Sequence, residues 1–162
     1  MNLQYLLQTA TQLRQPSAPA AAEFEASREG LAEELNRRMS ARPDLEKLIG
    51  PANLAMMQDN SRNFCRFMGA MFRSYEPEVL AQTALWVFRA YRSHGFKTTY
   101  WPANLDTFVE IARDRLAPAT FDEIYPFFQW LIVNIPTLVK ISDGQLADPV
   151  PPEPDHDPKK QP

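Results

Sequence analysis

The chain has 162 residues, of which 44% are hydrophobic, and a formal net charge of -3 at pH 7. This length and apolar content support one domain with one core, and the slight acidity gives no reason to expect a nucleic-acid partner, which needs a clustered basic excess. The single cysteine, Cys65, excludes an internal disulfide framework and indicates a reducing, cytoplasmic compartment.

The periodicity of the apolar residues predicts an all-α fold of about six helices. Only 5 glycines are present, and apolar side chains recur every three or four positions instead of alternating as in strands. The first four predicted helices cover about residues 2–14, 21–40, 51–74 and 77–95. The amphipathic pattern of each helix indicates that one face is buried. In the fourth helix the predicted core stripe consists of Leu80, Ala84, Val87, Phe88 and Tyr91.

The C-terminal part of the bundle is predicted to contain two more helices. One covers about residues 102–116, and the other begins at Thr120, which forms a capping box with Glu123. This last helix is apolar nearly all round, so we expect it at the centre of the bundle. Pro126 and Pro136 each remove a backbone donor and should bend or break it. Its apolar run is shorter than the roughly 20 residues that cross a bilayer, and no membrane span is predicted.

The predicted domain ends where the composition changes. Residues 1–143 form the helical bundle, in which the N-terminal helices of residues 1–50 pack on a four-helix core of residues 51–143. From residue 144 to residue 162 the chain contains 6 prolines and little that can be buried, so this tail is predicted to be disordered. Proline-rich tails of this kind can also dock into aromatic grooves of partners.

Scarcity of histidine limits the possible chemistry. His156, in the tail, could contribute to a weak metal-binding tract or simply be solvated, and the second reading predicts no metal site. His94 could ligate a haem or corrin metal, or interact with the carbonyl end of the helix that closes at Gly95. Cys65 has the character of a small buried hydrophobe. Since no nucleophile set, phosphate loop or metal motif is evident, we expect no catalytic residues.

Two other groups of residues are candidates for binding. Asp59, Asn63 and Arg66 share a face of the third predicted helix, and Arg62 pairs with Arg66 at an i, i+4 spacing. This polar face either binds an anionic group or a partner's carboxylates, or is the solvated side of an amphipathic helix.

The second group is an aromatic corner between two predicted helices. It consists of Phe96, Tyr100 and Trp101. Aromatic side chains dominate ligand pockets and interfaces, so the corner could line either, or it could plug the end of the bundle.

Residues 67–131 carry a pattern that resembles a known family. The segments FMGAMFRSYEPEVL, ALWVFRAYRSHGF and YWPANL precede a final apolar helix. This order is similar to the four-helix cap of cobalamin-binding domains, which folds over the corrin. The chain lacks that family's Glu-His pair in the last helix and its corrin-ligand domain. The resemblance therefore implies a sensory or regulatory bundle with a changed ligand. A looser similarity to globin-like sensor domains implies a form without haem.

Together these features predict a non-enzymatic sensory, regulatory or assembly module that acts through a protein partner or self-association, most simply without a cofactor. The alternative is a sensor or carrier that binds a tetrapyrrole or another apolar small molecule. That alternative predicts a cavity among five residues, which are Met57, Phe64, Met68, Trp86 and Trp130.

Overall fold

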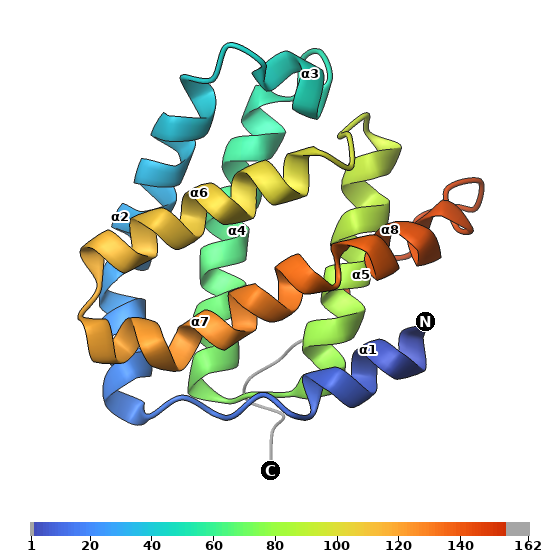
Figure 1. The fold of residues 1–162 in the computed structure, drawn as a ribbon. Helices are drawn as coiled ribbons and strands as arrows, with labels where there is room; N and C mark the ends of the chain where they lie inside the picture. Colours follow the sequence, from blue (N-terminus) through green and yellow to red (C-terminus); the bar gives the residue numbers. More distant parts are fainter. Residues whose placement is uncertain (1, 155–162) are drawn as a thin grey trace.

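The computed structural model describes residues 2–154, in which all regular structure is helical, as predicted (Figure 1). The described part contains eight helices, so the predicted number of about six is wrong. The helices are α1 (Leu3–Ala10), α2 (Ala18–Ser40), α3 (Leu45–Ile49), α4 (Leu54–Arg73), α5 (Pro77–Ser93), α6 (Tyr100–Arg115), α7 (Pro118–Val133) and α8 (Ile135–Asp143).

The two additional helices have separate causes. The short α3 forms between the second and third predicted helices, where no helix is predicted. The predicted last helix is divided at Asn134 into α7 and α8, which meet at an angle of 43°. Pro136 lies in the first turn of α8, where a missing N–H is tolerated. Pro126 does not break α7, because it lies on the exposed side of that helix, where the carbonyl that loses its partner can bind water.

The predicted capping box at Thr120 is also wrong. α7 begins earlier, at Pro118, and Thr120 is buried in its first turn. The carboxylate of Glu23, on α2, replaces the expected cap: it accepts a hydrogen bond from the backbone N–H of Ala117 at 2.8 Å and another from Thr120. These two hydrogen bonds lower the pKa of Glu23.

The other member of the predicted box, Glu123, caps the opposite helix. Its carboxylate accepts hydrogen bonds from the backbone N–H of Ser17 at 2.9 Å and from the Ser17 hydroxyl at 2.8 Å. Ser17 is itself the N-cap of α2. The N-termini of α2 and α7 are therefore joined by reciprocal side-chain caps, which fix the position of one helix start against the other.

The helices form two crossing layers with a third group beside them. In Figure 1, α2 and α4 run side by side, and α6 and α7 cross in front of them. α5 lies on the other side and packs closely against α1 and α8. The backbone of α5 lies close to α1 and α8 and farther from α4. Side chains therefore occupy the space between α4 and α5.

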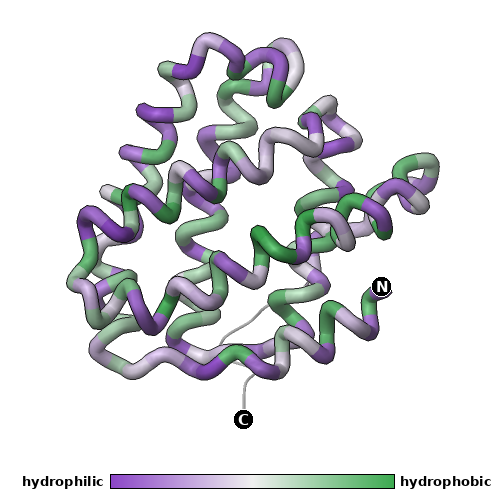
Figure 2. The backbone as a smooth tube through the Cα atoms, viewed as in Figure 1, coloured by the Kyte–Doolittle hydropathy of each residue, from purple (hydrophilic) through white to green (hydrophobic). Residues whose placement is uncertain are grey.

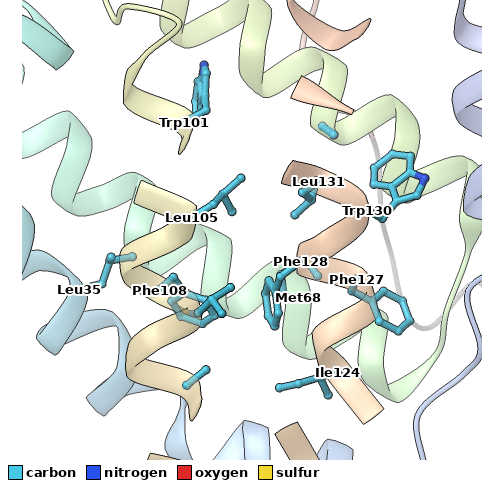
Figure 3. Close-up of a cluster of buried hydrophobic side chains, with 14 of the residues drawn as sticks. Leu35, Met68, Trp101, Leu105, Phe108, Ile124, Phe127, Phe128, Trp130 and Leu131 are labelled. Atoms are coloured by element: carbon cyan, nitrogen blue, oxygen red, sulfur yellow. The ribbon is translucent and has the colours of Figure 1, made fainter. Parts of the chain in front are cut away.

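The core lies where α6 and α7 face the first layer. Figure 3 shows Leu105 of α6 and Leu131 of α7 projecting toward each other, with Phe108, Phe128 and Met68 below them. The rings of Phe108 and Phe128 are 5.0 Å apart. In Figure 2 the most hydrophobic stretch of the tube falls on the second half of α7. The predicted central, fully covered position of this helix is wrong, because α7 has an exposed side that includes Pro126, Gln129 and Val133, the last of them 64% exposed.

Arg92 joins α8 to α5. Its guanidinium donates hydrogen bonds to the Val139 carbonyl at 3.1 Å, to the Ser142 hydroxyl at 2.7 Å and to Asp143 at 2.6 Å. Within residues 2–154 no single helix is both long and apolar enough to cross a bilayer, and only the bent pair of α7 and α8 reaches that length and composition together.

The C-terminal segment leaves α8 and returns to α5. Residues 144–148 form turns, and residues 149–154 are extended without regular structure. The tail predicted to be disordered extends to residue 162, and its last part, residues 155–162, lies outside the described residues.

Candidate functional site

A cavity of about 120 Å³ lies among α4, α5 and α6, with one side chain from α7 and one from the C-terminal segment. Its lining consists of Asn60, Asn63, Phe64, Phe67, Met68, Leu80, Thr83, Ala84, Trp86, Val87, Phe88, Tyr91, Trp101, Asn104, Leu105, Leu131 and Glu153. Most of these side chains are apolar, so the cavity provides an environment in which a hydrophobic group gains free energy on leaving water.

The inward face of α5 forms the longest wall of the cavity. Leu80, Ala84, Val87 and Tyr91 recur at spacings of three and four, which places them on one side of the helix. The sequence predicted this stripe as core. Thr83 also lines the cavity and is only 5% exposed, so one polar side chain belongs to the same buried face.

A buried polar group lies beside this apolar wall. The Tyr100 hydroxyl accepts hydrogen bonds from the side-chain amides of Asn60 at 3.3 Å and of Asn104 at 3.1 Å. The Asn60 contact joins α4 to α6, the Asn104 contact lies within α6, and both asparagines line the cavity. Burial raises the pKa of Tyr100 above its ordinary value, so the hydroxyl stays uncharged at physiological pH.

Trp101 lines the cavity and carries an unsatisfied donor. Its ring stacks on Phe88 with 4.5 Å between ring centroids, and the residue is 4% exposed. Within residues 2–154 its indole N–H has no hydrogen-bond acceptor. A buried donor left without a partner costs about 1–3 kcal/mol.

The charge of the lining indicates the charge of a suitable ligand. The helices contribute no ionisable lysine, arginine, aspartate, glutamate or histidine to it, and the one carboxylate, Glu153, comes from the C-terminal segment. An ion without a countercharge is strongly disfavoured in an apolar cavity. The cavity therefore suits an uncharged molecule.

The C-terminal segment crosses the mouth of the cavity, where Trp86 is only partly buried. The indole N–H of Trp86 donates a hydrogen bond of 2.7 Å to the Pro151 carbonyl. The Arg89 guanidinium, which is not part of the lining, donates one of 2.6 Å to the Pro149 carbonyl. This segment therefore contacts α5 through its backbone.

The predicted polar face of α4 is exposed and pairs within its own helix. Asp59 forms an ion pair with Arg62, and Arg66 donates a hydrogen bond of 3.1 Å to Asn63. All four side chains are exposed, as expected for the solvated side of an amphipathic helix. Asn63 alone among them also lines the cavity. The polar face therefore borders the mouth.

The aromatic corner is buried inside the end of the bundle. Phe96, Tyr100 and Trp101 are at most 4% exposed and contact one another edge to face or stacked. Only Trp101 among them reaches the cavity. His94 lies apart from these rings: it is exposed, and its backbone carbonyl accepts a hydrogen bond from the Asn53 side chain at 2.8 Å.

Neither a reactive thiol nor a metal cluster is present in the described part of the chain. Burial raises the pKa of the Cys65 thiol to about 12, which keeps it protonated and unreactive. No group of three or more potential ligands is close enough to hold a metal ion within residues 2–154. His156, the candidate for a metal-binding tract, lies outside the described residues.

Three of the five residues expected around a cavity do line it. These are Phe64, Met68 and Trp86. Met57 is buried elsewhere, and Trp130 points away from α6 in Figure 3 and donates a hydrogen bond of 2.9 Å to Thr9 of α1.

The polar lining residues Thr83 and Asn104 were not among the sequence-based candidates, whereas Asn60 belongs to the polar run of the third predicted helix. The signal that could have identified them is the presence of a polar residue at a position whose helical spacing assigns it to the buried face. Such a residue needs a partner in the interior.

Comparison with known proteins identifies no relatives. No family model matches the chain, and neither a curated protein nor a solved structure shows significant similarity to it. The function therefore has to be argued from the cavity and its surroundings.

Proposed function

We propose that the protein is a non-enzymatic sensory or regulatory module that binds a small, uncharged and mainly apolar molecule in the cavity among α4, α5 and α6. The observation that carries the proposal is the composition of the lining: apolar walls, a few neutral polar side chains, and no charge from any helix. Such a lining favours a hydrophobic ligand with one or two polar atoms. The helices offer it no charged acid, base or nucleophile for catalysis, and its one carboxylate is Glu153 of the C-terminal segment.

The size of the cavity restricts the ligand further. At about 120 Å³ it is comparable to the engineered cavities of about 150 Å³ that bind benzene or xenon. A ligand of one aromatic ring or a short branched chain fits this space. A tetrapyrrole is much larger and usually needs an axial ligand, whereas His94 is exposed and outside the lining. The small apolar ligand is therefore better supported than the tetrapyrrole.

A link between the cavity and a partner follows from the position of Asn63. This residue belongs to the exposed polar face of α4 and also to the lining. A ligand that moves Asn63 would alter its hydrogen bond with Arg66, on the surface where a protein partner or a second copy would dock. This arrangement supports a sensor that reports occupancy through protein interaction.

The binding proposal is tested with fluorobenzene as the probe, observed by ¹⁹F NMR. We expect saturable binding to the full chain and loss of binding in Ala84→Leu, because the added methyl groups fill the cavity that Ala84 lines. The matched control is Ala90→Leu, on the same helix and equally 9% exposed but outside the lining. Its affinity should stay within about twofold of the wild type.

Two results would contradict the proposal. One is the absence of saturable binding to the wild type, and the other is an equal loss of affinity in both variants. Circular dichroism spectra and melting curves of the two variants establish that each remains folded when binding is measured.

A further inference from the structure

In the part of the chain up to residue 154, the hydrogen bonds that hold the C-terminal segment on α5 go to its backbone carbonyls. Trp86 and Arg89 lie three residues apart and therefore on the same face of α5. They donate to the carbonyls of Pro151 and Pro149, at 2.7 and 2.6 Å. The segment thus has two attachment points, and neither depends on the identity of its side chains.

The sequence of this segment is suited to reversible docking. Proline occupies positions 149, 151, 152 and 154. Each proline ring fixes φ in the extended range and removes a backbone donor, so the free segment is already extended and its carbonyls have no internal partner. Docking therefore orders few degrees of freedom, and release leaves the carbonyls to water at little cost.

The location of the segment connects it to the ligand cavity. Trp86 contacts both, since its ring lines the cavity while its N–H holds Pro151. Glu153, two residues further along, also lines the cavity. The segment consequently lies over the mouth, next to the partly buried Trp86 and Tyr91.

We propose that residues 149–153 form a removable strap over the cavity, and that ligand exchange requires release of the strap from Trp86 and Arg89. This inference rests on the proposed function, because a gate needs a ligand to admit. The strap covers the mouth and fills little of the interior. Loosening it should therefore accelerate binding and release equally and leave the equilibrium affinity unchanged.

The docked state is tested first, without any ligand. Bimane, a fluorophore that tryptophan quenches on contact, is attached to the full chain at Val150→Cys, a position that is 38% exposed. Cys65 is buried and stays unlabelled, which the wild-type chain verifies. We expect quenched emission that recovers in the background of Trp86→Phe and does not depend on protein concentration. Unquenched emission, or quenching that grows with concentration because a second copy supplies the tail, would overturn the strap.

Gating is then measured as the exchange rate of fluorobenzene by ¹⁹F NMR line shapes. We expect Arg89→Met to raise the association and dissociation rates of fluorobenzene together by about tenfold. This is the factor that corresponds to the loss of one hydrogen bond worth about 1.4 kcal/mol. The Kd should stay within about twofold of the wild-type value. A tail variant that replaces Pro149, Pro151 and Pro152 by glycine should act in the same direction. This variant leaves every helix intact, so it remains informative even where Arg89→Met fails to fold.

The control for the arginine substitution is Arg14→Met, an exposed residue outside the cavity and the strap, which should not change either rate. Unchanged exchange in both strap variants, with fluorobenzene still bound, would refute the gate and leave the proposed function standing. Absence of fluorobenzene binding to the wild type would refute the proposed function, and with it the gate, whatever the bimane result.

Discussion

Trp101 illustrates how one side chain can serve packing and recognition together. Its ring is stacked on Phe88, edge to face with Tyr100, and buried, which accounts for its contribution to stability. Its indole N–H is left without an acceptor in the described part of the chain. Phenylalanine at this position would be smaller and would carry no unsatisfied donor. The retained donor is therefore consistent with a ligand that carries an acceptor atom.

This interpretation predicts a preference between two ligands of nearly equal size. Fluoropyridine carries an acceptor nitrogen and fluorobenzene does not. We expect the ratio of their affinities to shift toward fluorobenzene by about five- to tenfold in Trp101→Phe, because the donor is lost. The ratio cancels any general effect of the smaller ring on the cavity. Equal ratios in both proteins, measured by ¹⁹F NMR titration, would show that the indole N–H does not face the ligand.

The N-termini of α2 and α7 depend on each other, although the two helices lie far apart in the sequence. Glu23 of α2 caps the N-terminus of α7, and Glu123 of α7 caps the N-terminus of α2. A carboxylate near a helix N-terminus satisfies free backbone donors and interacts favourably with the helix dipole. The pair therefore couples the formation of α2 to that of α7.

The cap predicts a pH-dependent loss of stability. The pKa of Glu23 is lowered in the folded protein by hydrogen bonds from Thr120 and Ala117. The contribution of ionised Glu23 to folding stability is therefore fully present above its pKa in the unfolded chain, about 4.3. This contribution is lost as the pH falls through the lowered pKa that Glu23 has in the folded protein. We expect Glu23→Gln to lower the free energy of unfolding by about 0.5–1 kcal/mol at pH 7, and by less below pH 4.

The measurement is urea denaturation of the two proteins between pH 7 and pH 3. Glu33→Gln provides the control, since Glu33 is an exposed residue of the same helix. An equal difference between Glu23→Gln and the wild type at all pH values would indicate that ionisation of Glu23 does not support the cap.

On the scale of the whole molecule, the cavity depends on how α5 is held. α5 packs against α1 and α8, and Arg92 fixes α8 through three hydrogen bonds while its side chain is only 13% exposed. The C-terminal segment that crosses the cavity mouth begins directly after α8. The position of α8 therefore determines whether the segment can reach Trp86 and Arg89.

This dependence predicts a local effect of Arg92→Met. Loss of the three hydrogen bonds should destabilise the attachment of α8 by about 2 kcal/mol, which corresponds to roughly thirtyfold faster hydrogen exchange. We expect the amides of α8 to respond and those of α2 and α4 to be unaffected. Arg92→Lys should restore little, because one ammonium cannot replace the planar guanidinium.

Arg62→Met serves as the control for this experiment. Arg62 is exposed and pairs with Asp59 of its own helix, so its loss should leave α8 unchanged. Uniformly faster exchange throughout the protein in Arg92→Met would contradict a local role for Arg92.

The sequence by itself determined the fold class and most helix faces. Side-chain periodicity is a local property, and the stripe from Leu80 to Tyr91 identified the buried side of α5. Phe64, Met68 and Trp86 were likewise correctly expected at a cavity. The proline content predicted a disordered or extended tail, and residues 149–154 of it carry no regular structure. Each of these follows from residues within a few turns of one another.

Only the tertiary structure decided which distant groups meet. The cap of α7 comes from Glu23, and the acceptor for Asn60 of α4 is a tyrosine on α6. The partner of Trp86 is a backbone carbonyl 65 residues away. Backbone carbonyls carry no sequence signature, because every residue has one. Contacts of this kind depend on how the helices cross, and local periodicity contains no information about that crossing.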